Sequence, residues 1–209
     1  MTADGARPSI GKVYDIIVSP REHRTLGEQR QQMARGVDGV ILDIGGGTGV
    51  MLPYFDDVNE VHIVDPNPHF RARASEKAND SDVDVIIEDG RAENIPYGSE
   101  HFDHVIASQV LCSVADQARA IEELHRVLKA DGDFRYLEHV HSPGGWGIVE
   151  SLMTPAWKHV ADGCHLNRDT TAAIANGPFE ILDQIQLAVG ILPPKTYVRG
   201  RAQPVTTDK

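Results

Sequence analysis

A glycine-rich loop and two acids carry the clearest chemical signal in the sequence. Residues 43–49 read Asp-Ile-Gly-Gly-Gly-Thr-Gly and follow the apolar run at 40–42. Glycines there allow a sharp turn and let a ligand approach the backbone without meeting a Cβ atom. Asp65 follows Gly45 by 20 residues and ends the next apolar run, where a carboxylate can accept both hydroxyls of a ribose. The pattern predicts a nucleoside-binding site, with a plain turn and a strand-end acid as the alternative.

The spacing of the glycines separates the kinds of nucleotide site. Gly45, Gly47 and Gly49 give G-x-G-x-G, whereas a dinucleotide fingerprint needs a small residue at position 50, which is Val50. A phosphate-binding P-loop needs a lysine followed by serine or threonine, and the loop contains no lysine. An NAD-linked oxidoreductase is therefore the weaker interpretation. We expect a helix after the loop to direct its first N–H groups at the ligand.

Short apolar runs alternate with amphipathic segments along the chain, which predicts βαβ units around a parallel sheet. Because these runs are nearly continuous in apolar residues, we expect helices on both faces of the sheet. The predicted strands are 40–44, 61–64, 83–87, 104–108, 134–138, 181–187 and 196–201. The predicted helices are 21–36, a segment capped by Asp116 and ended by the Asp-Gly pair at 131–132, and 145–162 with a kink or break at Pro155.

Composition limits the class of protein and its partners. The 209 residues fit one domain, and 20 Lys and Arg against 31 Asp and Glu give a net charge of −11. That charge argues against nucleic acid or an anionic membrane as the partner and favours a small-molecule substrate. No apolar run is long enough for a membrane span or a signal peptide, so we expect a cytoplasmic protein. Two cysteines, Cys112 and Cys164, make no disulfide framework, and the oligomeric state is not predicted.

The loop and four later motifs together resemble the cofactor site of the class I S-adenosylmethionine-dependent methyltransferases. The similar segments are 41–49 (cofactor loop), 64–67 (ribose turn), 90–96 (adenine turn), 108–111 (beside the methyl group) and 127–132 (before the fifth strand). The resemblance spans about residues 38–140, and it implies S-adenosyl-L-methionine as the cofactor. It assigns cofactor contacts to Asp43, Gly45, Gly46, Gly47, Gly49, Asp65, Pro66, Asn67, Arg91, Ala92, Glu93, Ser108, Gln109 and Val110.

The resemblance also implies the fold and its boundaries. The fold is a single-domain, Rossmann-like α/β fold with a doubly wound, seven-stranded sheet that is mostly parallel and has an antiparallel last strand. We expect an N-terminal helical segment at 1–37, the methyltransferase domain at 38–201 with a cap at about 142–170, and a flexible tail at 202–209.

One position of the adenine turn departs from the family pattern. Many members read Gly-Asp-Ala there, with the acid accepting from the adenine amino group, and the middle residue of this chain is Arg91. The backbone of Ala92 can still contact the adenine, and Asp89 can replace the missing acid.

Three later segments resemble the alkyl-thiol methyltransferases known from animals. They are Leu-Cys-Ser-Val within 110–114, Glu-His-Val at 138–140, and Pro-Ala-Trp followed by Asp-Gly-Cys-His-Leu-Asn-Arg within 155–168. The resemblance implies methyl transfer to the sulfur of a small thiol or hydrogen sulfide. A partly ionised thiol needs little acid–base assistance near neutral pH. The alternatives are carbon or nitrogen methylation of a quinone-type ring or a lipid headgroup, and a protein that binds the cofactor without catalysis.

Two residues are candidates for a catalytic role. His139, at the end of the fifth predicted strand, can act as a base, orient the acceptor, or be satisfied by backbone alone. Cys112 can exchange with a thiol substrate or serve as a small buried residue beside the cofactor. Glu138 can hydrogen-bond a nearby loop.

The remaining histidines and the aromatic residues of the cap give weaker signals. The pairs His139/His141 and His159/His165 belong to no compact ligand motif, so no metal site is expected. The side chains expected to line the acceptor pocket, or else to pack in the core, are Trp146, Met153 and Trp157.

Overall fold

A seven-stranded sheet forms the centre of the computed structural model, which describes residues 20–56, 58–160, 163–189 and 195–205. The strand order is β3-β2-β1-β4-β5-β7-β6. The first five strands pair in parallel, and β7 is antiparallel to both β5 and β6, which confirms the predicted fold class. The strands are β1 (Val40–Ile44), β2 (Glu60–Val64), β3 (Asp84–Glu88), β4 (Phe102–Ser108), β5 (Leu128–His139), β6 (Phe179–Val189) and β7 (Lys195–Pro204).

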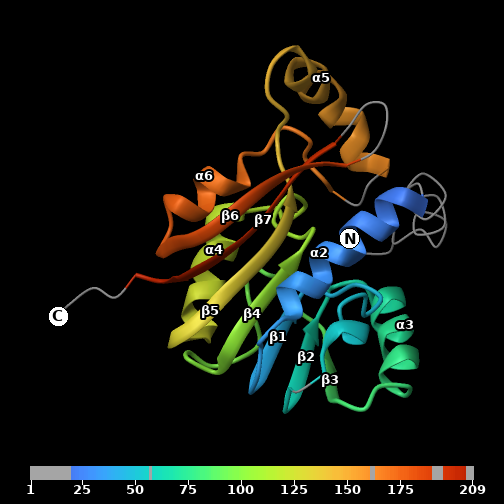
Figure 1. Ribbon diagram of the computed structural model, residues 1–209, viewed down its shortest axis with the longest axis vertical. Helices are drawn as coiled ribbons and strands as arrows, with labels where there is room; N and C mark the ends of the chain where they lie inside the picture. Colours follow the sequence, from blue (N-terminus) through green and yellow to red (C-terminus); the bar gives the residue numbers. More distant parts are fainter. Residues whose placement is uncertain (1–19, 57, 161–162, 190–194, 206–209) are drawn as a thin grey trace, which may run out of the picture.

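Helices cover both faces of the sheet, as the continuous apolar runs predict (Figure 1). One face packs against α2 (Pro20–Ala34), the short 3-10 helix η1 (Leu52–Tyr54) and α3 (Pro68–Ala78). The other face packs against α4 (Gln117–Val127) and α6 (Thr170–Ala175). The remaining described helix, α5 (Gly145–Val160), lies beyond the carboxyl ends of the parallel strands (Figure 1). Among the described residues, no helix combines the length and apolar character needed to cross a bilayer.

Successive residues of a central strand therefore pack in the two different hydrophobic cores, one on each face of the sheet. Ile41 packs with α2 and α3, whereas Leu42 and Ile44 pack with α4, because side chains alternate across a strand. All three are at most 1% exposed. The same alternation places Asp43 on the α2 face, and it separates Glu138 from His139 at the end of β5.

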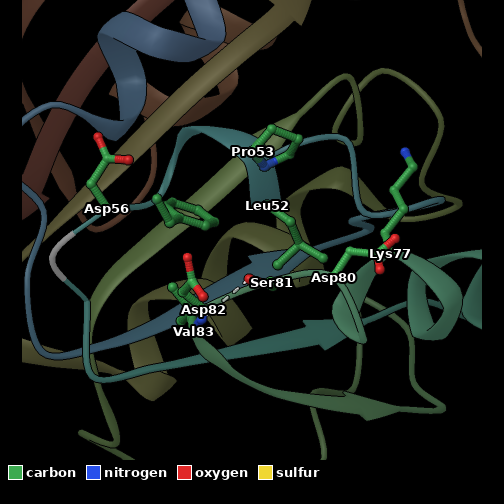
Figure 2. A pocket seen from close by; sticks show the side chains of 9 residues that line it. Leu52, Pro53, Asp56, Lys77, Asp80, Ser81, Asp82 and Val83 are labelled. Carbon is green, nitrogen blue, oxygen red and sulfur yellow. Dashed lines mark hydrogen bonds between the residues drawn. The ribbon is translucent and has the colours of Figure 1, made fainter.

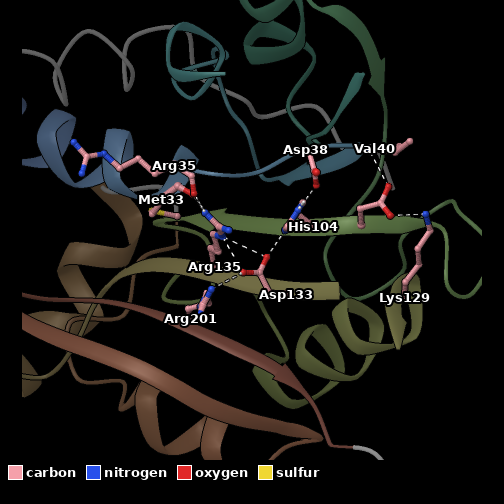
Figure 3. Close-up of polar contacts among 10 residues, drawn as sticks. Met33, Arg35, Asp38, Val40, His104, Lys129, Asp133, Arg135 and Arg201 are labelled. Atoms are coloured by element: carbon pink, nitrogen blue, oxygen red, sulfur yellow. Dashed lines mark hydrogen bonds and ion pairs between the residues drawn. The ribbon is translucent and has the colours of Figure 1, made fainter. Parts of the chain in front are cut away.

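A polar cluster fixes the C-terminal end of α2 to the sheet (Figure 3). The guanidinium of Arg135, on β5, donates to the carbonyls of Met33 (2.8 Å) and Arg35 (2.6 Å). The carboxylate of Asp133 accepts from Arg135 Nε at 3.0 Å and hydrogen-bonds His104. Burial opposes ionisation of Asp133, but the hydrogen bond to His104 and the nearby Arg135 hold its pKa below the ordinary value. A helix anchored in this way can hold a side chain steadily over the sheet edge.

Two predicted helix features are wrong. The helix α4 begins where expected, with the Asp116 carboxylate accepting from Arg119 N at 3.0 Å, but it ends at Val127, before the Asp-Gly pair at 131–132. Leu128 is already extended and pairs with Phe102, because burying Leu128 in the sheet requires the chain to leave the helix there.

The helix expected to direct its first N–H groups at the ligand after the glycine loop is also not formed as an α-helix. Only η1 follows the loop, and Phe55 is already extended, with its side chain 5% exposed in the core. Burial of Phe55 thus directs the chain toward β2 after a single 3-10 turn. A helix this short presents no extended row of N–H groups to a ligand.

The boundaries at the end of the chain need one correction. The strand β7 runs to Pro204, and Ala202 is fully buried and pairs with Phe134, so residues 202–204 belong to the sheet and not to a tail. The helix α5 continues through Pro155, where a kink or break is predicted. The side chain of His159 and the predicted segments 1–19, 161–162 and 206–209 lie outside the described residues.

Candidate functional site

The glycine loop leaves β1 at the carboxyl edge of the sheet and bends back over it. Gly45 has a φ of +58° and Gly47 a φ of +57°, in the left-handed region that favours glycine. A Cβ on Gly45 would lie 2.7 Å from a methyl carbon of Val110, so the loop packs directly against the chain after β4. A Cβ on Gly47 would have one heavy atom within 4 Å, the Gly45 carbonyl oxygen at 3.8 Å. The backbone at position 47 is therefore open to a ligand.

Asp65, at the end of β2, is buried beside this loop and holds its shape. One carboxylate oxygen accepts from Gly47 N at 3.0 Å and the other from Asn67 N at 2.8 Å. The side chain of Asn67 caps α3 by accepting from His69 N at 3.0 Å, and Pro66 lies exposed between the two residues. Backbone hydrogen bonds thus fix the Asp65 carboxylate in one orientation next to the open position of the loop.

Asp43 is the most unusual ionisable group of the site. Its side chain is fully buried, and neither carboxylate oxygen accepts a hydrogen bond from any residue in the described part of the chain. Desolvation and the nearby negative charge of Asp65 raise the pKa of Asp43 to about 7, and Arg30 opposes that rise. A Cβ on Gly46 would lie 2.5 Å from Asp43 Oδ2, so the loop passes directly over the carboxylate. A buried carboxylate without protein donors is suited to a cationic or hydrogen-bonding ligand.

The chain after β4 turns without any glycine. Gln109 has a φ of +65°, which is uncommon for a residue with a Cβ and costs free energy. Its backbone N–H donates to the Leu137 carbonyl at 2.7 Å. Arg30, reaching from α2, donates to Ser108 Oγ at 3.2 Å and to Gln109 Oε1 at 2.9 Å. Sequence reasoning missed Arg30, because nothing distinguishes it from the other basic residues of its helix.

Glu138 holds the next three residues of this chain segment. Its carboxylate accepts from the backbone N–H groups of Val110 (2.9 Å), Leu111 (3.0 Å) and Cys112 (3.1 Å). Glu138 is fully buried, and desolvation raises its pKa well above the ordinary value although the three backbone donors oppose the shift. The structure confirms that Glu138 hydrogen-bonds a nearby loop and shows that the loop is the one that follows β4.

A second long-range contact holds the same loop from the cap. The guanidinium of Arg168 donates to the carbonyls of Leu111 (3.0 Å) and Val114 (2.7 Å). Gln117, in the first turn of α4, also donates to the Leu111 carbonyl, at 3.1 Å. Arg168 was not among the predicted site residues, although it ends the Asp-Gly-Cys motif of the cap. Its structural role became visible only with the fold.

The adenine turn is fixed by its contacts with α4. Glu93 Oε1 accepts from Ala115 N at 2.7 Å, so this predicted cofactor residue serves the start of the helix. The side chain of Arg91 is 65% exposed and lies 3.8 Å from the Glu93 carboxylate. Ala92 is buried between them. The Asp89 carboxylate pairs with Arg71 at 2.8 Å. The turn therefore offers backbone atoms to a ligand and keeps its charged side chains engaged elsewhere or in solvent.

His139 and Cys112, the two predicted catalytic residues, are both buried. His139 lies on one face of β5, and Cys112 lies near Glu138 on the other face. His139 is 3% exposed, its ring lies 5.5 Å from that of Tyr197, and neither ring nitrogen has a partner among the described residues. Burial, with Lys195 and His141 nearby, lowers the pKa of His139 to about 4. The imidazole is thus neutral at physiological pH. Cys112 is 2% exposed, and its thiol lies against Cys164 on the Glu138 side.

The cap contributes an apolar helix face and one aromatic contact. Exposed fractions on α5 are 66% for Ile148, 77% for Leu152 and 46% for Met153, so Met153 does not pack in the core. Trp157 is partly buried, contacts Cys164, and lies under Lys195, whose Nζ is 5.7 Å from the ring centroid. Trp157 is therefore a predicted pocket residue that lies near Cys112, since both contact Cys164.

A surface pocket of about 410 Å³ lies beside the end of the glycine loop, next to Gly49 (Figure 2). It is formed by residues 52–56 of the η1 region and by residues 80–83 before β3, with Lys77 at its edge. None of the residues predicted to bind the cofactor line this pocket, and it belongs to the packing of η1 against the α3–β3 turn.

Comparisons with known proteins agree with this geometry. Residues 42–136 match the model of a methyltransferase domain. Human thiol S-methyltransferase TMT1B is 26% identical over 203 residues, covering 89% of this chain and 82% of that protein. The mouse TMT1B protein is 30% identical over 181 residues, covering 79% of this chain and 73% of its own length. The crystal structure of YcgJ from Bacillus subtilis is 17% identical and superposes with a TM-score of 0.69 over 88% of this chain, which shows a shared fold.

Proposed function

This chain belongs to the class I S-adenosylmethionine-dependent methyltransferases, and from that premise we propose that it methylates the sulfur of a small thiol or of hydrogen sulfide. Its human and mouse relatives are thiol S-methyltransferases, which supports this class of acceptor. The net charge of −11 supports a small-molecule substrate over a nucleic acid.

The residues at the sheet edge fit S-adenosylmethionine. The buried Asp43 carboxylate, which no described residue hydrogen-bonds, provides an acceptor for the cationic amino acid part of the cofactor. Asp65 is oriented toward the opening at Gly47, where it can accept ribose hydroxyls. When bound, the cofactor supplies a methyl carbon attached to a positively charged sulfur, which is the electrophile of the reaction.

The rest of the site favours positioning over proton transfer. Methyl transfer is an in-line displacement, which gains most from orientation and from exclusion of water. The loop after β4 is held by Glu138 and Arg168, so it provides a rigid wall next to the glycine loop. His139 is neutral at physiological pH because its pKa is lowered to about 4, so it can orient an acceptor but is a weak base. The burial of His139, with no described residue bonded to either ring nitrogen, is the observation that supports a thiol acceptor beside the thiol S-methyltransferase relatives.

An ionised thiol reacts without help from a base, and this gives a direct test. Small thiols, phenols, quinones and amines are offered in turn, and the release of S-adenosylhomocysteine is measured across a range of pH. If the thiolate is the nucleophile, the rate at low acceptor concentration rises with pH around a midpoint that follows the pKa of each thiol. A base on the enzyme would give one midpoint for all thiols. Turnover with a phenol, a quinone or an amine but with no thiol would contradict the proposal.

A variant of His139 separates orientation from base catalysis. We expect His139→Ala to lower kcat/KM about tenfold or less, because only positioning of the acceptor is lost, whereas loss of a general base costs about 10²- to 10⁴-fold. His69→Ala, which truncates an exposed histidine on α3, is the matched control. A loss above about 100-fold in the His139 variant, with the control unchanged, would identify His139 as the base.

A further inference from the structure

We propose that Cys112 and Cys164 form a redox-active dithiol that closes to an intramolecular disulfide by exchange with a small disulfide such as glutathione disulfide. This modification site goes beyond the proposed methyl transfer and does not depend on it. It is carried by the way the cap lies against the loop after β4.

The backbone brings the two cysteines together. The backbone N–H of His165, the residue after Cys164, donates a hydrogen bond to the carbonyl of Cys112 at 2.9 Å. This hydrogen bond holds the backbones around the two cysteines together. Gly163 has a φ of +85°, and a Cβ there would lie 3.0 Å from the carbonyl oxygen of Ser113. The turn at 163–165 therefore lies flat against the backbone of 112–113. In this arrangement the thiols of Cys112 and Cys164 are neighbours that interact with each other.

The two thiols differ in access and in ionisation. Cys112 is 2% exposed, whereas Cys164 is only partly buried, next to Trp157. The neighbouring Cys112 thiol lowers the pKa of Cys164, with further help from Trp157 and Lys195, against the opposing effects of desolvation and Glu138. The neighbouring Cys164 thiol and burial raise the pKa of Cys112. Cys164 is thus the attacking thiolate and Cys112 the resolving thiol.

The exchange balances without any further reactant. The Cys164 thiolate attacks one sulfur of glutathione disulfide, which forms a mixed disulfide and releases one glutathione thiolate. Cys112 gives its proton to solvent and attacks the sulfur of Cys164, which forms the protein disulfide and releases the second glutathione. Two protein thiols are oxidised and one glutathione disulfide is reduced to two thiols. The new bond links the cap covalently to the segment that Glu138 and Arg168 already hold.

The test uses the full chain in buffers with graded ratios of glutathione to glutathione disulfide. Peptide mapping without reductant should find one Cys112–Cys164 peptide per chain, and both free thiols should disappear together as the buffer becomes more oxidising. The oxidised protein should unfold at a higher denaturant concentration than the reduced protein, because the bond constrains the unfolded chain. Neither measurement requires a substituted protein.

A matched pair of variants tests the order of the two steps. Cys112→Ser should accumulate glutathione on Cys164, because the resolving thiol is absent. Cys164→Ser should take up glutathione on Cys112 at least about tenfold more slowly, since that thiol is buried and protonated. The proposal is overturned if the wild type keeps both thiols in a buffer that modifies Cys112→Ser, if the only disulfides join separate chains, or if Cys112 reacts first.

Discussion

Two adjacent loops, one after β1 and one after β4, form the centre of the site and obtain their shapes in different ways. The β1 loop uses glycine, with Gly45 and Gly47 in the left-handed region and few side-chain contacts at the open position. The β4 loop places Gln109 in the same region and is held by side chains from distant parts of the chain. Glycine conformations and a contact from Asp65 shape the first loop, whereas side chains from several distant elements hold the second.

The two buried carboxylates beside these loops also differ in the number of hydrogen bonds that they accept. Asp43 lies under the β1 loop and accepts no hydrogen bond from a described residue, whereas Glu138 accepts three from the β4 loop. A carboxylate with three protein donors stabilises the fold, and a buried carboxylate without donors costs stability until a ligand provides them. We therefore propose that Glu138 supports the architecture of the site and that Asp43 binds its ligand.

The largest expected effect is the loss of stability in Glu138→Ala. The substitution leaves three backbone N–H groups without their acceptor, two of them on the buried residues Leu111 and Cys112. We expect the free energy of unfolding to fall by about 3 kcal/mol or more. Denaturant unfolding measures this change. Glu138→Gln, which retains one acceptor oxygen, should lose less, and equal losses in both variants would show that the hydrogen bonds are not the cause.

Asp43→Asn should have the opposite effect to Glu138→Ala: the affinity for S-adenosylmethionine should fall, and the free energy of unfolding should not. The amide is nearly isosteric and removes a buried charge that no described residue compensates, so the unfolding free energy should stay equal or rise. The affinity for S-adenosylmethionine should fall by about 1.5–3 kcal/mol, because a charge-assisted contact is lost. Calorimetry measures the affinity, with Asp84→Asn at an exposed position as control. Unchanged affinity together with lower stability would reverse the assignment of Asp43.

The pH dependence of stability provides an independent measure of Asp43. Its pKa rises from 3.8 to about 7 on folding, so the folded protein retains a proton that the unfolded chain loses. This contribution to stability is fully present below about pH 3.8 and is lost as the pH rises through about 7, with a slope of at most about 1.4 kcal/mol per pH unit. In Asp43→Asn the fall between these values should be smaller. Parallel curves for the two proteins would show that the Asp43 carboxyl titrates normally.

The contrast between the loops also explains what the sequence could predict. The β1 loop, Asp65 and the positions of the strands follow from short motifs and apolar periodicity, because their determinants lie close together in the chain. The strand order follows from the resemblance to the methyltransferase family. Arg30 and Arg168 were missed, since each acts on a loop more than 50 residues away and neither belongs to a local pattern. The end of α4 was mispredicted at 131–132 because pairing of Leu128 with β4 overrides the local stop signal.

The smallest expected effect concerns a third loop, the adenine turn after β3. Like the β4 loop, this turn is held by side chains from other parts of the chain. Its backbone is held by α4, with Ile95 N donating to Glu123 Oε2 at 3.0 Å and Arg126 donating to the carbonyls of Ile95 and Tyr97. These contacts, like those of the β4 loop, come from distant residues. The side chain of Arg91 has no part in them, because it is 65% exposed and its ion pair within the described part of the chain is the 3.8 Å contact with Glu93.

Arg91→Ala should therefore change the affinity for S-adenosylmethionine by less than about 0.5 kcal/mol, since an exposed ion pair of this kind contributes little. Glu123→Ala, in the same turn-to-helix contact, should weaken both binding and stability, because Ile95 N loses its acceptor and Arg126 loses its partner. Calorimetry and denaturant unfolding on both variants give the comparison. A loss of about 0.5–2 kcal/mol in Arg91→Ala is the size expected for a guanidinium stacked on a ring. That result would mean that Arg91 moves onto the adenine when the cofactor binds, and that the turn recognises the base through a side chain in addition to its backbone.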